Sequence, residues 1–434
     1  MQKIIINHFG PIKHCEMEIK KFIFCTGVQA SGKSTIAKSI FFFKNIRNIL
    51  FAQIRKSILL YASQEESMEL SVRSRLLKEI RSNFLQVFGT TWHMDTEMRV
   101  EYYYSDETAI HISLREEKDT HNYIWVDFSS DLENFFTELD RELSNSQNSS
   151  SDGIERIHKR IDDAFQENAE IVYIPAGRSM ITLLSTQLNY IYSSMDDFQK
   201  RSLDYCTQSY LERILQLKPN FSQGPSQMIK DKMALTDEKV DKERLWDAVK
   251  LMSEILKGEY RNVEGEERLQ ISHDKYVKIN FASSGQQEVL WILNVLFYYL
   301  LNNRKTYFII EEPESHLFPN AQKLIAEFIL LVCNKEGNQL FVTTHSPYIL
   351  GTVNNLLYAN KISKTVDQYK LTRIVKKNKW VSFEALAAYY IVNGEAASCT
   401  DEEFESLKNE VIDGASEMIN RDFEYMIGLE EETE

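Results

Sequence analysis

A glycine-rich stretch near the start of the sequence has the residues needed to bind phosphate. GVQASGKST, residues 27–35, follows an apolar run and has the spacing G-x-x-x-x-G-K-S. Two glycines let the backbone form a tight loop whose amides face an anion, and a helix starting at about residue 32 adds positive potential. The lysine reaches terminal phosphates, and the following serine hydroxyl is a ligand for Mg²⁺. The predicted phosphate contacts are Gly27, Ala30, Ser31, Gly32, Lys33, Ser34 and Thr35.

A pair of adjacent carboxylates supplies chemistry that phosphate binding alone lacks. In TYFIIEEPESHLFP, residues 306–319, an apolar strand is followed by Glu311 and Glu312, at the edge where α/β sheets place ligand chemistry. We expect Glu311 to hold Mg²⁺ with Ser34, and Glu312 to be the general base that deprotonates the attacking water. Adjacent strand residues point to opposite faces, so both can serve one site only if the chain turns there, which Pro313 favours. The alternative is an exposed acidic turn.

Two further segments carry polar groups suited to a nucleotide site. FASSGQQE, residues 281–288, places small residues and amides at the start of an apolar helix, and a helix N-terminus binds anions. The candidate phosphate contacts in it are Ser283, Gly285 and Gln286, with a plain helix cap as the alternative. LFVTTHSPYIL, residues 340–350, is an apolar strand ending in His345. That imidazole can hydrogen-bond a γ-phosphate or the attacking water, and a purely structural histidine is the alternative.

The elements expected around these residues form a mixed α/β arrangement. Apolar residues after the phosphate-binding loop recur at helical spacing and predict one long helix from about residue 33 to beyond residue 60, which argues against a chance motif. Residues 180–257 are expected to be mostly helical, interrupted at 218–227 by a segment of disordered composition, and 144–153 is expected to be a mobile loop. Strands are expected at 3–7, 16–25, 98–104, 109–114, 122–128, 169–174, 260–263, 269–272 and 276–280.

Composition bounds the class of protein. The chain has 434 residues and a formal net charge of −14, so it is long enough for two lobes and lacks the overall basic charge of a nucleic-acid coat protein. Its five cysteines have no C-x-x-C spacing, which indicates reduced thiols in a cytoplasmic protein. The N-terminus has no signal-peptide pattern. The longest apolar run, 289–301, is too short to span a bilayer, so no membrane partner is expected.

Taken in this order, the four segments resemble the heads of ABC-type ATPases, and more narrowly the RecF/SMC/OLD-like branch. GVQASGKST resembles the Walker A motif, SSGQQE the signature motif, and FIIEEPE the Walker B motif with its catalytic glutamate. Residues 315–317 occupy the position of the D-loop and His345 that of the switch histidine. The resemblance covers residues 1–45 and 260–360 well and the middle of the chain loosely.

The sequence departs from that pattern at several positions. Glu311 stands where most such enzymes have Asp, and neither Gln53 nor Gln64 has the context of the Q-loop glutamine. YIPAGRS, residues 173–179, is similar to a segment of small OLD-like ATPases. The resemblance makes Arg178 a candidate phosphate- or partner-facing cation, with a surface or salt-bridged arginine as the alternative.

The resemblance implies ATP and Mg²⁺ as ligands, ATP hydrolysis, and a partner copy. In ABC-type heads the signature motif of one subunit covers the ATP of the other, so one copy of each motif implies a homo-oligomer of head-to-tail pairs. The implied fold is an ABC-type P-loop head with an N-terminal antiparallel β subdomain and an inserted, mainly helical lobe. The expected domains are 1–60 and 258–365 for the two parts of the head, 61–167 for an inserted helical and β subdomain, 168–257 for a helical lobe, and 366–434 for a C-terminal β-hairpin and helical tail.

Three functions compete. We favour an ATP-driven switch subunit of a bacterial anti-phage defence complex of the Septu, PARIS or retron-associated type, gating a separate effector such as a nuclease. The residues after His345 contain no D-x-D motif, so nuclease chemistry would belong to another chain. A RecF-like ATPase that binds DNA directly is the alternative. A transporter ATPase is disfavoured by the motif style and the long insert. For that RecF-like alternative, three clusters offer local cations, although such a cluster is more often a solvated helix or turn face than a DNA site. They are Arg47, Arg55 and Lys56; Arg73, Arg75 and Lys78; and Lys376, Lys377 and Lys379.

Overall fold

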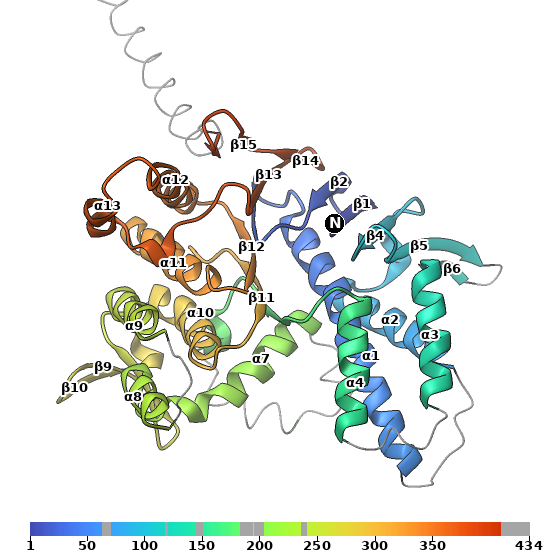
Figure 1. Ribbon diagram of the computed structural model, residues 1–434, viewed down its shortest axis with the longest axis horizontal. Coiled ribbons are helices and arrows are strands. Elements are labelled where there is room, and N and C mark those ends of the chain that lie inside the picture. Colours follow the sequence, from blue (N-terminus) through green and yellow to red (C-terminus); the bar gives the residue numbers. More distant parts are fainter. Residues whose placement is uncertain are drawn as a thin grey trace, which may run out of the picture.

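One large mixed sheet organises the protein. The computed structural model describes residues 1–62, 71–117, 120–143, 151–182, 194, 204–235 and 241–408. Within them, the sheet has 11 strands in the order β6-β5-β4-β1-β2-β14-β13-β3-β12-β11-β7 (Figure 1). The last five strands of that order are mutually parallel: β13 (Leu386–Val392), β3 (Phe22–Gly27), β12 (Gln339–Thr344), β11 (Thr306–Glu311) and β7 (Glu170–Ile174).

The other six strands form a mainly antiparallel part of the same sheet. β1 lies between β2 and β4, with antiparallel pairing on both sides, and β4, β5 and β6 continue outward as a meander. β14 joins the two parts, because it pairs with β13 on one side and with β2 on the other. The bounds are β1 (Lys3–Phe9), β2 (Ile12–Glu18), β4 (Arg99–Tyr103), β5 (Ala109–Glu117), β6 (Thr120–Phe128) and β14 (Glu395–Ser398).

The parallel strands separate two hydrophobic cores. Phe22 and Phe24 belong to one core, whereas Ile23 and Cys25 belong to the other, as the two-residue period of a strand requires. All six residues of β3 are buried, because helices cover both faces of a parallel sheet. One face carries α1 (Lys33–Ala62), α2 (Val72–Phe88), α3 (Ser130–Leu143) and α4 (Ser151–Ala164).

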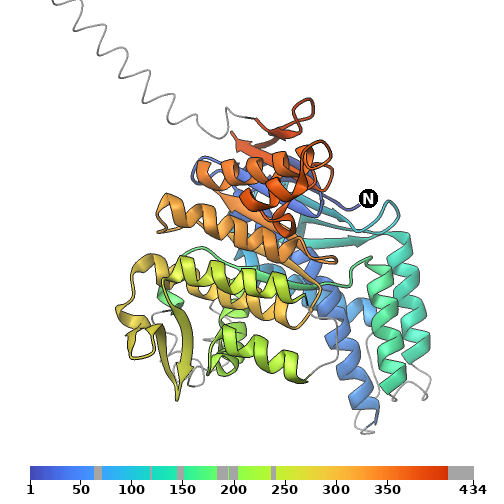
Figure 2. The same ribbon diagram turned by 60° about the vertical axis from the view of Figure 1, so that its left-hand side comes forward.

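The opposite face carries most of the remaining helices (Figure 2, where the yellow-green to orange helices lie across the sheet from the blue and teal ones). These are α8 (Pro225–Leu235), α9 (Lys242–Leu256), α10 (Ser284–Leu301), α11 (Pro319–Cys333) and α12 (Pro347–Ile362). Helix α7 (Tyr205–Leu217) lies beside the edge strand β7 and contributes to both cores. Smaller elements are α13 (Gln368–Ile374), η1 (Thr91–His93), η3 (Lys218–Phe221), η4 (Ile279–Phe281), η5 (Lys377–Lys379), β15 (Thr400–Asp401) and β16 (Ser406–Leu407).

Most of the expected elements are present. The α/β fold class is confirmed, and so is the long helix after the phosphate-binding loop, which is α1. The strands expected at 98–104, 109–114 and 122–128 are β4, β5 and β6. Those expected at 260–263, 269–272 and 276–280 form a separate sheet of β8 (Glu259–Val263), β9 (Glu266–Ser272) and β10 (Lys275–Lys278). The described part of 180–257 is mostly helical, as expected.

The single strand expected at 16–25 is wrong. The chain forms β2 up to Glu18 and starts β3 at Phe22, because the two strands lie in different parts of the sheet. β2 pairs antiparallel with β1, whereas β3 pairs parallel with β12 and β13. Residues 19–21 connect the two strands. The pattern of apolar and polar residues continues through this connection, so the sequence does not reveal it.

The disorder expected at 218–227 is also wrong. η3 and the start of α8 occupy this segment, and Phe221 is fully buried against the rings of Tyr260 and Trp291. One aromatic side chain therefore anchors a segment whose composition is otherwise polar. Of the mobile loop expected at 144–153, residues 144–150 lie outside the described residues and 151–153 form the first turn of α4.

The domain ranges stay predictions. Strands β4 to β6 extend the main sheet and β7 is its edge strand next to β11, although both groups lie in ranges expected as insertions. The C-terminal hairpin is β13 and β14, and the helical tail expected after it lies outside the described residues. None of the described helices combines the length and the apolar character needed to cross a membrane.

Candidate nucleotide site at the carboxyl edge of the parallel strands

The parallel part of the sheet brings the predicted motifs to one edge. β3, β12, β11 and β7 are consecutive parallel neighbours, so their carboxyl ends lie side by side. The phosphate-binding loop follows β3, His345 follows β12, Glu312 follows β11, and Arg178 comes shortly after β7. This edge is where open α/β sheets bind ligands.

The phosphate-binding loop requires glycine at two positions for different reasons. Gly27 has φ +148°, and a Cβ atom there would lie 2.4 Å from the carbonyl oxygen of Ile391 on β13. Gly32 has φ +106°, and its Cβ would meet the side chains of Ile12 and Pro11. Strand β13 therefore leaves no room for a side chain at position 27, and the β1–β2 hairpin leaves none at position 32. Ala30, also at positive φ, is exposed at the tip of the loop.

Lys33 is buried inside its own loop at the first position of α1. Its Nζ donates to the carbonyl oxygens of Gly27 at 3.0 Å and Val28 at 2.8 Å, and lies 3.4 Å from Ser31 Oγ. Burial lowers the pKa of Lys33 below its usual 10.5, an effect that the nearby carboxylates of Glu312 and others oppose. Ser34 and Thr35 follow in the first turn of the helix. An ammonium group held within the loop at the start of a helix fits a phosphate ligand.

Ser34 and Glu311 meet where the sequence places a metal site. Ser34 Oγ donates to Glu311 Oε2 at 3.2 Å, and the buried hydroxyl of Tyr173 on β7 donates to the other carboxylate oxygen. Most enzymes that the sequence resembles here have the shorter Asp at this position. The longer side chain of Glu311 nevertheless reaches the Ser34 hydroxyl. A hydroxyl and a carboxylate are oxygen ligands of the kind that Mg²⁺ prefers, so the two residues fit that ion.

Glu312 turns away from the strand and faces His345. Its amide still donates to the carbonyl of Thr343 on β12 at 2.9 Å, but its backbone adopts φ +41°, so the chain turns directly after the last residue of β11. Because of this turn, Glu312 Oε1 lies 3.2 Å from His345 Nε2, and both side chains are about one-third exposed. The change of direction that the adjacent carboxylates require is thus provided by the backbone.

Glu314 is a member of this group that the sequence did not single out. Its Oε1 accepts hydrogen bonds from the hydroxyl of Thr344 and from the amide of His345, both at 2.7 Å. Burial raises the pKa of Glu314, and these two donors oppose the rise. The carboxyl thereby holds the end of β12 next to the segment after β11. Its position in E-E-P-E was visible in the sequence, but its partner on another strand was not.

The tip of α10 is a helix cap and is also exposed. Ser283 caps the helix by accepting from the amide of Gln286, and the Gln286 side chain accepts from the amide of Ser283. Gln286 Nε2 also donates to the carbonyl of Leu256. The capping alternative therefore holds, and contact of Ser283 and Gly285 with a phosphate stays a prediction. Gly285 packs closely below the D-loop position, since a Cβ there would lie 2.7 Å from the carbonyl oxygen of His316.

The resemblance made Arg178 a candidate cation facing a phosphate or a partner, but the structure places its side chain in the interior. Its side chain is fully buried and forms an ion pair with Glu288 of α10, with Nη2 3.2 Å from Oε1. The salt-bridged alternative is the correct one. Removing one partner of such a buried pair costs about 3–5 kcal/mol, because the other charge is left uncompensated. The sequence could not find Glu288, which lies in an apolar helix far along the chain.

Several of the cations considered for DNA binding have other partners. Lys376 pairs with Asp247 at 2.5 Å, Lys379 with Glu327 at 2.6 Å and Arg73 with Glu133 at 2.7 Å. Arg47 is buried and pairs with Asp162. Gln53, considered and rejected as a Q-loop residue, donates to the carbonyl of Arg75, and Gln64 lies outside the described residues. These contacts weaken the case for a DNA-binding face.

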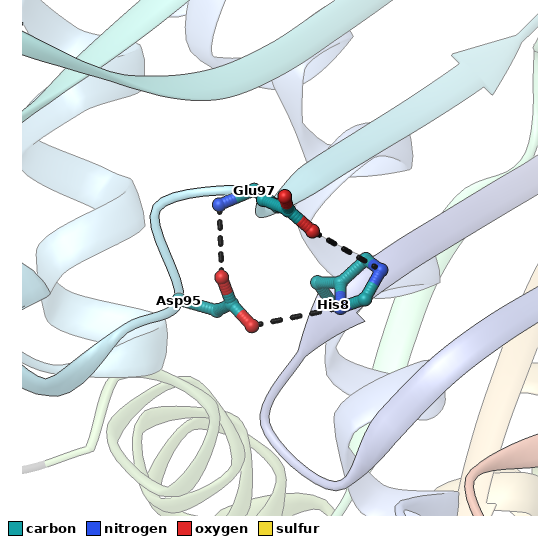
Figure 3. A group of neighbouring side chains, drawn as sticks. All are labelled: His8, Asp95 and Glu97. Atoms are coloured by element: carbon teal, nitrogen blue, oxygen red, sulfur yellow. Dashed lines mark hydrogen bonds and ion pairs between the residues drawn. The ribbon is translucent and has the colours of Figure 1, made fainter.

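A second polar group lies between β1 and the segment that precedes β4. His8, Asp95 and Glu97 are the group of described residues whose side chains have the spacing of metal ligands (Figure 3). However, Asp95 approaches ring atom Nδ1 at 3.5 Å and Glu97 approaches Nε2 at 3.7 Å, so the carboxylates face different sides of the imidazole. All three side chains are exposed. The group is best described as an exposed histidine between two carboxylates.

Comparisons with known proteins place most of the chain in one family. The family model described as an AAA ATPase domain matches residues 1–350. No curated protein matches the chain. Among solved structures, an SMC head bound to the C-terminal winged-helix domain of ScpA is similar, with 13% identity, 92% of this chain and 98% of that chain covered, and a TM-score of 0.44.

Two other solved structures are similar at a lower level. They are the SMC head domain from Thermotoga maritima (11% identity, 92% and 98% covered, TM-score 0.36) and a dimeric bacterial ABC transporter cassette (12% identity, 91% and 96% covered, TM-score 0.28). Similarity at this level says nothing about substrates or partners. The family match covers most of the chain and includes the phosphate-binding loop, both adjacent carboxylates and His345. The chain belongs to the AAA ATPase domain family.

Proposed function

We propose that the chain binds ATP with Mg²⁺ and hydrolyses it at the carboxyl edge of the parallel strands. One observation carries the proposal: two pairs of side chains with complementary roles meet at this edge. Ser34 lies 3.2 Å from Glu311, and His345 lies 3.2 Å from Glu312. The first pair has the ligands for a metal ion, and the second has a base and a group that can hold a phosphate or a water.

Each residue has a defined part in this reaction. The loop amides and Lys33 bind the phosphates. Ser34 and Glu311 would hold Mg²⁺, which would supply positive charge that offsets the charge of the phosphates. Glu312 accepts a proton from the attacking water, and His345, whose Nε2 faces that carboxylate, fixes the orientation of Glu312. Because Glu314 binds the amide of His345, it keeps that imidazole beside the base.

The site is completed by a second copy of the chain. Ser283 and Ser284 are exposed at the tip of α10, and a helix N-terminus favours an anion. Each chain has one such tip and one phosphate-binding loop. A head-to-tail pair would therefore form two sites, each with the loop of one chain and the tip of the other. ATP would then favour the paired state and hydrolysis would release it.

A rate measurement tests both parts. We expect ATP turnover per chain to rise with protein concentration and level off, and the particle size to increase with ATP when hydrolysis is slowed. Turnover per chain that is constant over a wide concentration range, with a monomer throughout, would contradict the paired site. Absence of Mg²⁺-dependent phosphate release would contradict the ATPase.

The cellular role that we propose is that of a cytoplasmic switch subunit in a bacterial anti-phage defence complex, gating a separate effector. It is supported by the resemblance to OLD-like ATPases. In a phage challenge, cells that carry the chain with its neighbouring gene should be protected, and the Lys33→Ala variant should abolish protection. Tight DNA binding by the chain alone, with a steep salt dependence, would favour the RecF-like alternative instead.

A further inference from the structure

A buried arginine joins helix α10 to the two adjacent carboxylate residues. Arg178 is 0% exposed and Glu288 1%. Arg178 Nη1 donates to the backbone carbonyl of Glu311 at 2.6 Å, and Nη2 donates to that of Glu312 at 2.9 Å. The Glu288 carboxylate accepts from the backbone amides of Arg178 at 3.0 Å and Ser179 at 2.6 Å. One guanidinium thus contacts three elements: the segment after β7, the end of β11 and α10.

These contacts act on the backbone that orients the base. The guanidinium is a planar fork, and it bonds the carbonyls of two consecutive residues, Glu311 and Glu312. Glu312 has φ +41°, a conformation that persists only when its surroundings enforce it. The position of Arg178 therefore influences the turn that aims Glu312 towards His345.

The other end of the connection is the tip of α10. Glu288 lies one helical turn after Gly285, which itself packs against the carbonyl of His316. The capping box and the buried apolar side chains hold this helix along its length, so we expect a displacement of its tip to shift the helix as a unit. A small displacement of the tip would accordingly be passed through Glu288 and Arg178 to the backbone of Glu312.

We propose that Arg178 and Glu288 are positioning residues that make hydrolysis at one site depend on the triphosphate bound by the other copy. The inference rests on the proposed head-to-tail pair. When the tip of α10 of one chain contacts the triphosphate bound by the partner copy, the Arg178–Glu288 ion pair of that first chain orients its own Glu312 towards His345. Two ATP molecules therefore promote each other's hydrolysis, and the pair of sites responds cooperatively.

The test compares two ion pairs in which the arginine is buried. Arg178→Lys keeps the charge but loses the fork, and Glu288→Gln keeps the shape but loses the charge. The matched controls are Arg47→Lys and Asp162→Asn, because Arg47 is also buried and its Nε lies 2.6 Å from Asp162, on α1 and α4. For each variant, ATP affinity of the monomer, kcat, the Hill coefficient for ATP and the melting temperature are measured.

We expect the wild-type chain to give a Hill coefficient above one. Arg178→Lys and Glu288→Gln should bind ATP with unchanged affinity, lose between about tenfold and about a hundredfold in kcat, and give a Hill coefficient of one. The controls should keep the cooperative response. If Glu288→Gln does not fold because it leaves the buried Arg178 charge uncompensated, Arg178→Lys carries the test, since it keeps the charge that pairs with Glu288.

Two results would overturn the inference. One is that the Arg178 and Glu288 variants keep the kcat and Hill coefficient of the wild-type chain. The other is that the controls lose kcat and cooperativity to the same degree, which would make the pair merely structural. Failure of the proposed function is distinguishable from both, because the wild-type chain itself would then lack ATP turnover or its dependence on protein concentration.

Discussion

The imidazole Nε2 of His345 lies 3.2 Å from Oε1 of Glu312, although the two residues end different strands. The contact exists because β11 and β12 are parallel neighbours and because Glu312 leaves its strand at φ +41°. Neither side chain is deeply buried, so a water molecule can reach both of them.

Replacement of Glu312 by Gln tests the base. The amide cannot accept a proton from water, so we expect kcat to fall about a hundredfold or more while ATP still binds. Slow hydrolysis should also let the ATP-bound pair accumulate, which light scattering would measure. Glu395→Gln on the exposed strand β14 is the control for loss of one charge. Turnover at the wild-type rate in Glu312→Gln would show that another group is the base.

Removal of the Lys33 side chain tests the phosphate-binding loop. Lys33→Ala should bind ATP at least tenfold more weakly, because the loop loses the charge that faces the phosphates. Titration with a fluorescent ATP analogue gives the affinity. Circular dichroism should show an unchanged fold, since Lys33 contacts mainly the carbonyls of its own loop. An ATP affinity equal to that of the wild-type chain would contradict the assignment.

The pH dependence of ATP binding should follow the lowered pKa of Lys33. Only the charged ammonium binds phosphate, and burial lowers its pKa below 10.5 in the ATP-free protein. Affinity is therefore expected to be highest below that lowered pKa and to fall as the pH rises through it. The triphosphate does not account for the fall, because phosphates finish ionising near pH 6–7. Equilibrium titrations between pH 7 and pH 10 measure it, and a constant affinity in a folded protein would be the contrary result.

A bulky cation at the tip of α10 tests the contribution of the second copy. Ser283→Arg should block hydrolysis and ATP-dependent pairing, while the monomer binds ATP normally, since Ser283 is exposed and its own chain's phosphate-binding loop is unchanged. Thr365→Arg, at an exposed position between α12 and α13, is the matched control. Full ATP turnover by Ser283→Arg would exclude the paired site at this tip.

Gly27→Ala tests how β13, which is far along the chain but adjacent to β3 in the sheet, constrains the phosphate-binding loop. The added Cβ would lie 2.4 Å from the carbonyl oxygen of Ile391, so the loop or β13 has to move. We expect a loss of about 1–3 kcal/mol in the free energy of unfolding and weaker ATP binding. Gly89→Ala is the control, because Gly89 also has positive φ but no atom within 4 Å of the new methyl group. Equal losses in the two variants would show that the contact with Ile391 is unimportant.

The sequence by itself determined the local chemistry of this protein. The phosphate-binding loop, the adjacent carboxylates and the strand that ends in His345 are local patterns, and their residue types and spacing follow from short-range geometry. The length of α1 and the meander of β4 to β6 were predictable for the same reason, since periodicity reports on neighbouring residues.

Only the tertiary structure decided how these pieces act on one another. The split of 16–25 into β2 and β3 depends on which strands lie beside them, and the burial of Phe221 depends on Tyr260 and Trp291. Arg178 changed from a candidate surface cation to a buried residue because Glu288, far along the chain, lies next to it. Such contacts join residues that no local pattern relates, and they form only when the sheet and its helices have packed.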